Sequence, residues 1–201
     1  MKFSLLLLLG ALSCSRPPKT LVDPQLAIYM PEHATVVAGV DLDRLRGTPL
    51  FAKIPQSFRE GSYTLIGYDG NELVTASRAG SRVTVSGPAV KGRPPELLQH
   101  AGDAPIWVVA RGNASLPLTG NLANLNRLLQ QTNYTTASAR IGERVELEIA
   151  GVCDSPAIAQ HLEENVRAIA SLMKLPLDVR RDGATVHATG SITADAAGKL
   201  F

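Results

Sequence analysis

The chain has 201 residues, of which 45% are hydrophobic and 19% are charged, so it is long enough to bury a sizeable core. The 20 Lys and Arg residues nearly balance the 18 Asp and Glu residues, and the formal net charge is +2. Because nucleic-acid binding depends on clustered Lys and Arg, this scattered and almost neutral charge excludes nucleic acid as an expected partner.

The N-terminal residues have the layout of an export signal. Lys2 is followed by an apolar stretch from Phe3 to Leu12, and then by Ser13 and Cys14. A short positive start, an apolar core and small residues at its end are typical of a signal peptide. The apolar core is too short for a permanent membrane span, which needs about 20 residues. We therefore expect residues 1–13 to be a signal peptide.

The segment Ala11-Leu12-Ser13-Cys14 resembles the lipobox of bacterial lipoproteins. In that family the signal is cut before the cysteine, whose thiol carries diacylglycerol and whose new amino group is usually acylated. The resemblance implies that Cys14 is lipidated and anchors an exported protein to a bacterial membrane. Ser15, where Asp would favour the inner membrane, implies the outer membrane, facing the periplasm of a Gram-negative host. The alternative is an ordinary signal peptide cut at the same bond, which would leave Cys14 as a free thiol.

Residues 14–25 are predicted to be the lipidated cysteine and a flexible tether, because the prolines at 17, 18 and 24 disfavour regular structure. Residues 26–201 are expected to form one globular domain with candidate halves 26–103 and 104–201. In the first half, the β-branched run 34–40 predicts a buried strand. Asp41 is suited to cap a helix that follows it.

A meander of three strands is predicted over residues 62–87. The side chains alternate there with a period of two, and turns fall at Asp69-Gly70 and at 79–81. A short helix at 95–101 and a buried strand at 105–111, which contains Trp107, are expected to complete the first part of the domain.

The clearest helix opens at Ser155-Pro156 and carries one apolar stripe, formed by Ile158, Leu162, Val166, Ile169 and Met173. Another helix is expected to begin at Asn121, and a short one to end the chain at 193–200. Hairpins are predicted around 141–143 and around Asp182-Gly183.

The predicted fold class is α+β, with an antiparallel sheet and helices packed on one face of it. Two segments, 37–41 and 149–154, each end a strand and lead into a helix and then a hairpin. They make two strand–helix–hairpin repeats a candidate organisation; chance similarity between two common units is the alternative.

No established catalytic motif is found in the chain, and we predict no catalytic, cofactor-binding or metal-binding residue. The four histidines lie far apart, and His161 is not paired as in zinc motifs. Asp41 and Asp43 are better explained as a helix cap and a first-turn charge. Cys153 is expected to be a small buried hydrophobe. Cys14 is thus the only predicted site residue.

Three functions are compatible with the sequence. The first is a non-enzymatic, lipid-anchored protein of the cell envelope that binds another protein or has a structural role. The second is a periplasmic binder of a small or lipidic ligand in a cleft between sheet and helices. The third is an enzyme of unrecognised type. The segments 30–34 and 41–50 are also loosely similar to uncharacterised bacterial secreted proteins, a likeness that carries no activity.

We predict that the wild-type protein, expressed in a bacterial host, gains the mass of diacylglycerol and partitions with membranes. Cys14→Ser removes the thiol, so this variant should lack the added mass and stay in the soluble fraction. Intact-mass spectrometry and membrane fractionation check both results. An unmodified, soluble wild type would contradict the anchor.

Overall fold

A computed structural model of the chain describes residues 22–49, 51–53, 56–88, 91–116, 124–172 and 174–193. The expected signal peptide, Cys14, Asn121 and most of the expected terminal helix lie outside these ranges. The described chain begins with helix α1 (Pro24–Ala27), which Asp23 caps by accepting a hydrogen bond from the Gln25 N–H. Regular structure therefore starts inside the range assigned to the tether.

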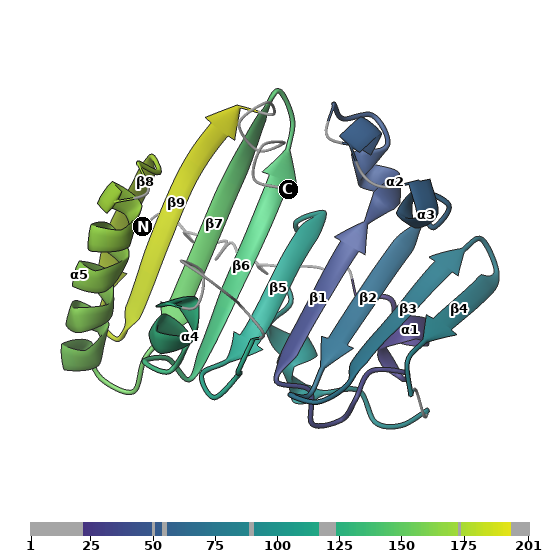
Figure 1. Cartoon of the computed structure of the whole chain (residues 1–201), viewed down its shortest axis with the longest axis horizontal. Coiled ribbons are helices and arrows are strands. Elements are labelled where there is room, and N and C mark those ends of the chain that lie inside the picture. Colours follow the sequence, from purple (N-terminus) through teal and green to yellow (C-terminus); the bar gives the residue numbers. More distant parts are fainter. Residues whose placement is uncertain are drawn as a thin grey trace, which may run out of the picture.

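The described strands form one antiparallel sheet in the order β4-β3-β2-β1-β5-β6-β7-β9-β8, seen face-on in Figure 1. The strands are β1 (Val36–Asp41), β2 (Tyr63–Tyr68), β3 (Leu73–Ala79), β4 (Arg82–Ser86), β5 (Ile106–Arg111), β6 (Tyr134–Ile141), β7 (Arg144–Val152), β8 (Leu177–Asp182) and β9 (Thr185–Thr193).

The helices are few and mostly short. They are α1, α2 (Leu42–Leu45), η1 (Phe51–Lys53), α3 (Gln56–Arg59), η2 (Glu96–His100), α4 (Asn124–Leu129) and α5 (Pro156–Leu172). Only α5, with 17 residues, exceeds six residues among the described helices. The single large sheet, rather than a layer of helices, is therefore the main element of the fold.

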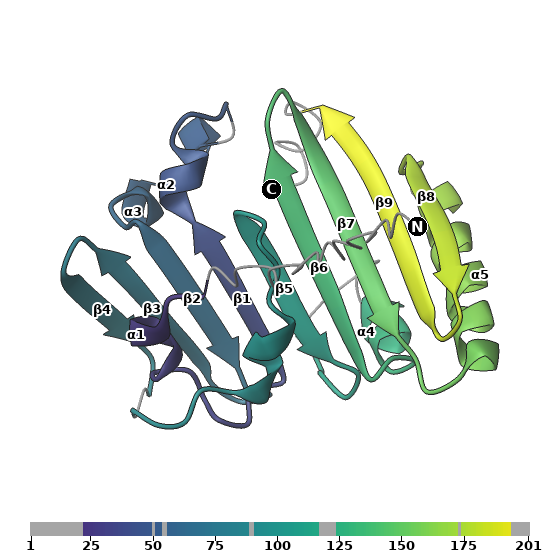
Figure 2. The ribbon, with the colours of Figure 1, turned by 180° about the vertical axis from the view of Figure 1, so that it is seen from behind.

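The prediction of an α+β fold with helices packed on one face is wrong. The structure is dominated by its nine-stranded sheet, and the helices lie on both faces. In Figure 1, α4 and α5 lie in front of the sheet, whereas Figure 2 shows α1 on the opposite side. The apolar stripe predicted on α5 indicates that this helix packs on another element, but not which face of the sheet it covers.

The two expected repeats also differ in their strand pairing. Strand β1 pairs with β2, the first strand after its helical connection. Strand β7 pairs with β9, the second strand after α5, and β8 lies outside β9 at the edge. The proposed correspondence between segments 37–41 and 149–154 therefore does not describe this sheet.

The individual strands and hairpins agree well with the sequence predictions. The turn at Asp69-Gly70 joins β2 and β3, and Gly70 has a φ of +111°, which suits glycine. The Asp69 carboxylate accepts hydrogen bonds from the N–H groups of Glu72 and Asn71, which lower the pKa of Asp69. The hairpins β6–β7 and β8–β9 are also present, and Asp41 caps α2 by accepting from the Arg44 N–H.

The sheet has two apolar layers on opposite faces. One face of the β1–β4 half is covered by α1 and η2, whose Leu26 and Leu97 pack with Val37, Leu65 and Val109. The other face is apolar in the β6–β9 half, where α4 and α5 cover it. Strands β1 and β5 lie where the two layers meet, and they contribute apolar side chains to both faces of the sheet. This explains their unbroken hydrophobic runs.

Trp107 fills the centre of the first layer, directly opposite Gly39 on the neighbouring strand. Its indole N–H donates a buried hydrogen bond of 3.2 Å to the Tyr63 hydroxyl. Burial raises the pKa of Tyr63 to about 12, so the phenol stays protonated at neutral pH. A Cβ atom on Gly39 would overlap the indole ring. Glycine is therefore required here to admit the tryptophan.

We predict that Gly39→Ala lowers the free energy of unfolding by about 3 kcal/mol, because the added methyl group must displace the indole from a filled core. Gly47→Ala is a matched control, since no atom lies within 4 Å of its Cβ position. The control should change stability by less than about 0.5 kcal/mol. Urea unfolding measures both, and equal stabilities of the two variants would contradict this packing.

Candidate functional site

A hollow lies between the sheet and the helices α4 and α5. It has a volume of about 510 Å³ and is partly open to solvent. This volume falls within the range of small-molecule binding sites. The floor is formed by five strands and the edge strand β8, and the roof by the two helices and the loops next to them. The described lining is Val36, Val108, Ala110, Leu116, Leu128, Leu129, Thr132, Thr135, Ala137, Ile149, Gly151, Leu162, Val166, Ile169, Ala170, Leu175, Leu177, Val186 and Ala188.

Strand register places two rows of uncharged residues across the floor. One row runs from β5 to β9 through Val108, Ala137, Ile149 and Ala188. The parallel row consists of Ala110, Thr135, Gly151 and Val186. Because paired residues of an antiparallel sheet point to the same face, both rows face α5. The alanines of these rows have short side chains, whereas the position above Gly151 is already taken by Leu162 and Thr132, each with an atom 3.1 Å from where a Cβ would lie.

The roof comes mainly from the apolar stripe predicted on α5. Leu162 is buried, and Val166 and Ile169 also face the hollow. The Ser155 hydroxyl accepts a hydrogen bond from the Ile158 N–H at 3.3 Å, as expected for an N-cap. At the other end, Leu175 donates its N–H to the Ala170 carbonyl, and this turn brings the Leu175 side chain into the lining.

The polar groups of the lining are satisfied within the protein. The hydroxyls of Thr132 and Thr135 lie 3.1 Å apart and share a hydrogen bond. Thr132 also bonds to the Leu129 carbonyl at 2.8 Å. None of the described lining residues is charged. The site can therefore hold hydrocarbon, but its described residues offer no acid, base or nucleophile for catalysis.

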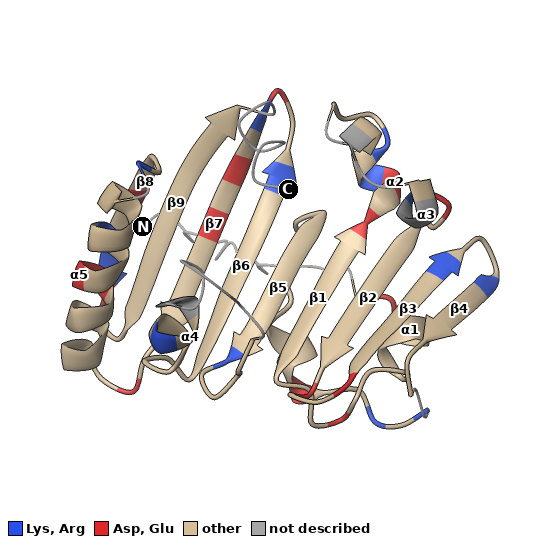
Figure 3. Cartoon of the chain, viewed as in Figure 1, with Lys and Arg blue, Asp and Glu red and all other residues tan. Residues whose placement is uncertain are grey.

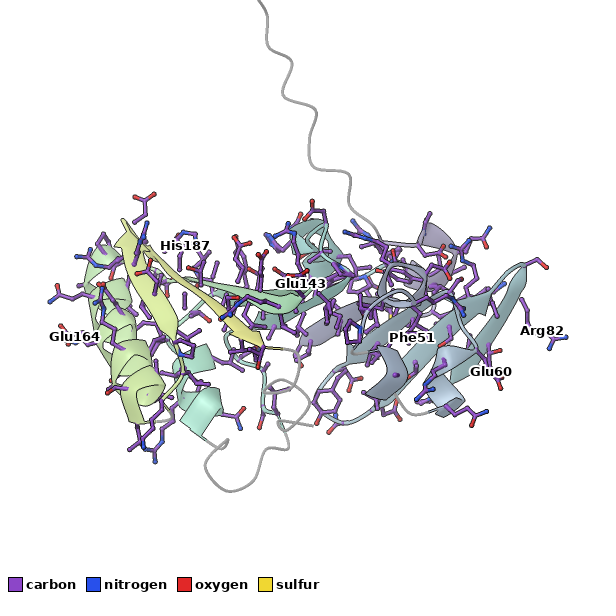
Figure 4. The ribbon with its side chains drawn as sticks, turned by 90° about the horizontal axis from the view of Figure 1, so that it is seen from above. Phe51, Glu60, Arg82, Glu143, Glu164 and His187 are labelled. Atoms are coloured by element: carbon purple, nitrogen blue, oxygen red, sulfur yellow. The ribbon has the colours of Figure 1, made fainter. Side chains whose placement is uncertain are left out.

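The charged residues lie elsewhere in the molecule. Strand β9 carries no Asp, Glu, Lys or Arg, and β1, β5 and β6 carry charge only near their ends (Figure 3). On α5, Glu164 points outward from the helix, away from the sheet (Figure 4). Strands β7 and β8, which also contribute to the floor, do carry charged residues, but none of these lines the hollow.

Helix α5 is fastened firmly along its side toward β8. Arg167 donates a hydrogen bond of 2.6 Å to the Val179 carbonyl and pairs with Glu163 at 2.7 Å. Glu163 also pairs with Arg181 at 3.3 Å. The hydrogen bond from Arg167 is the main reason why the pKa of Glu163 is lowered. These contacts join the helix to the edge strand.

The side of α5 toward α4 is held much more weakly by polar contacts. Among the described residues, one exposed hydrogen bond joins the helix to the α4 region, from the Asn165 amide to Gln131 Oε1 at 3.5 Å. This distance is at the long limit for a hydrogen bond. The helix therefore has one strongly attached side and one weakly attached side.

The residues singled out from the sequence do not meet at this site. Asp41 caps α2, and Asp43 pairs with Arg46 at 3.1 Å. Cys153 is buried beside α5, and burial raises the pKa of its thiol. His161 lies on the exposed surface of α5. No group of three or more His, Cys, Asp or Glu residues suited to a metal occurs in the described part of the chain.

A second, smaller hollow of about 400 Å³ is polar and lies near the end of β3. Its charged residues include Asp43, Arg46, Glu60 and Arg78. Asp43 and Arg46 pair with each other. Arg78 pairs at 2.6 Å with Asp23, whose side chain is 6% exposed. Because three of its charges are already neutralised by partners in the protein, this hollow is the weaker candidate.

The sequence predicts a sheet–helix cleft only as an alternative, and it predicts the stripe of Leu162, Val166 and Ile169 without assigning it to that cleft. The signal that points to it is the small residues Ala110, Ala137, Gly151 and Ala188 within the predicted strands. Their common location becomes visible only when the pairing of β5, β6, β7 and β9 is known.

Comparison of the chain with protein-family models, with curated proteins and with solved structures finds no match. Within the described residues, none of the helices combines the length and apolar character that crossing a membrane requires.

We predict that Glu163→Gln lowers the melting temperature by about 2 °C at pH 7, because it weakens the attachment of α5 to β8. A carboxylate with a lowered pKa stabilises the fold above its unfolded pKa, and this stabilisation is lost as the pH falls through the folded value. The difference from wild type should therefore disappear in acid. Glu143→Gln, in the exposed β6–β7 turn, is the control, and thermal unfolding at pH 7 should show the melting temperature of the wild type.

Proposed function

We propose that this protein binds an apolar, lipid-like ligand in the hollow between the sheet and α5, without catalysing a reaction. The observation that carries the proposal is a cavity of about 510 Å³ whose described lining contains no charged residue. A cavity of this size within an apolar layer leaves side chains without packing partners, which is unfavourable unless another apolar group fills it. A bound hydrocarbon chain would supply those contacts.

The chemistry of the lining favours a hydrocarbon chain over a polar ligand. The two threonine hydroxyls already have partners, so a polar ligand would lose its water without gaining hydrogen bonds in return. Each methylene group buried contributes about 0.8 kcal/mol. Affinity should therefore rise about fourfold per added methylene until the cavity is filled, and it should depend little on salt.

The attachment of α5 supports a route for the ligand between α4 and α5. The β8 side is held by Glu163 and Arg167, whereas the opposite side has only the long contact between Asn165 and Gln131. Movement of the helix about its β8 side would break the weakest polar contact first. The route to the hollow in this proposal is thus the α4–α5 boundary.

An exported, lipid-anchored location fits this function but rests on a separate argument. The lipobox-like segment that ends at Cys14 supports anchorage in the cell envelope, more specifically at the outer membrane. A protein held at a membrane surface meets lipidic molecules at high local concentration. We therefore propose an envelope protein that holds a lipid or another hydrocarbon-bearing molecule.

We predict that Ala137→Phe lowers the affinity for the uncharged fluorophore N-phenyl-1-naphthylamine at least tenfold. Ala137 lies in the floor of the hollow, where a phenyl ring would occupy the space of the ligand. Filling an existing cavity should also stabilise the protein by about 0.5–2 kcal/mol. Fluorescence titration and urea unfolding measure the two effects, and displacement by n-alkanols from octanol to tetradecanol measures the dependence on chain length.

Ala150→Phe is the matched control, because Ala150 lies on the neighbouring strand β7, next to Ile149 but pointing to the opposite face. Its affinity for the fluorophore should stay within about twofold of wild type. Loss of binding in both variants, or no binding by the wild type, would overturn the proposal. Destabilisation by Ala137→Phe would instead show that the hollow is closed in solution.

A further inference from the structure

The two edge strands of the sheet differ in how they are protected against pairing. Strand β8 has four charged residues among its six, Asp178, Arg180, Arg181 and Asp182, and α5 packs beside it. Charged side chains and a covering helix are common means of blocking an edge. Strand β4 has the sequence Arg-Val-Thr-Val-Ser, with one charged residue at its start. By these criteria β4 is the unprotected edge.

No described element lies beside the outer side of β4, which forms one end of the sheet in Figures 1 and 2. Arg82, its one charged residue, points away from the rest of the protein at this end (Figure 4). The outer edge of β4 is thus accessible to another strand.

The β3–β4 turn determines which backbone groups of β4 are free. Residues 80 and 81 form a two-residue hairpin loop, with Gly80 at a φ of +60°, so Ala79 and Arg82 are its closing pair. Hydrogen-bonded and non-hydrogen-bonded pairs then alternate along the hairpin. The backbone N–H and C=O groups of Thr84 point toward β3 and form hydrogen bonds with it, whereas those of Val83 and Val85 point outward. These four groups are a ready template for an antiparallel partner.

The sequence of β4 is complementary to itself. If two copies align antiparallel about a two-fold axis at Thr84, Val83 of each copy lies opposite Val85 of the other. The outward groups of these valines then form hydrogen-bonded pairs, and the two Thr84 side chains face each other. Valine and threonine pairs of this kind stabilise antiparallel strands. Arg82 lies opposite Ser86, so no like charges meet.

We infer that two copies of this protein associate through their β4 strands, which joins their sheets across an isologous two-fold interface. The self-complementary register and the absence of charge conflict favour a second copy over an unrelated strand. Because five residues in each chain form the contact, the dimer is a weak one that forms at high protein concentration.

The test uses the exported protein with Cys14→Ser, which removes the expected lipid anchor. Sedimentation velocity over a concentration series up to about 0.5 mM should show a reversible dimer. Thr84 is exposed and would lie beside its counterpart, so Thr84→Lys and Thr84→Glu each place like charges about 5 Å apart. Each variant alone should dimerise at least tenfold more weakly, and an equimolar mixture of the two should recover the dimer.

Thr189→Lys is the control, because Thr189 is also exposed on a strand but lies on β9, inside the sheet. It should dimerise as the parent protein does, and thermal unfolding by circular dichroism should show that all variants are folded. A monomeric parent protein at the highest concentration would overturn the inference. So would dimers that persist in Thr84→Lys, or a mixture of the two charge variants that stays monomeric.

Discussion

The structure depends on the central antiparallel pair β1–β5, which is apolar on both of its faces. Ala38 pairs with Val108 at the middle of this contact, and the neighbouring pair Val37–Val109 points to the opposite face of the sheet. Because this pair belongs to two apolar layers at once, the N-terminal and C-terminal halves can bury opposite faces of one sheet. A central strand with one polar face would allow only one of the two layers to extend across it.

The two layers are packed to very different degrees. In the first, Trp107 occupies the space that Gly39 leaves open, and its indole bonds to Tyr63. In the second, Leu162 of α5 lies over Gly151, but a hollow of about 510 Å³ remains between the helix and the rest of the floor. The first layer is thus a filled core, and the second contains a candidate binding site.

Helix α5 connects the stability of the second layer with the proposed function. The contacts of Glu163 and Arg167 fix the helix to β8, and its apolar stripe closes the hollow from above. The weaker contact toward α4 leaves one boundary that can open at small free-energy cost. A roof held on one side is a suitable arrangement for a ligand that must enter and leave.

The sequence by itself determined the local structure. The alternation in 62–87, the turn at Asp69-Gly70 and the Ser155-Pro156 cap predicted strands, hairpins and α5 correctly, because these depend on residues close together in the chain. It also supplies the lipobox-like segment, which remains a prediction. Only the tertiary structure decided that β9 inserts between β7 and β8, that helices cover both faces, and that Ala110, Ala137, Gly151 and Ala188 share one floor. These features depend on pairing between distant strands, and alternation along a strand shows that its two faces differ but not which neighbour or helix each face meets.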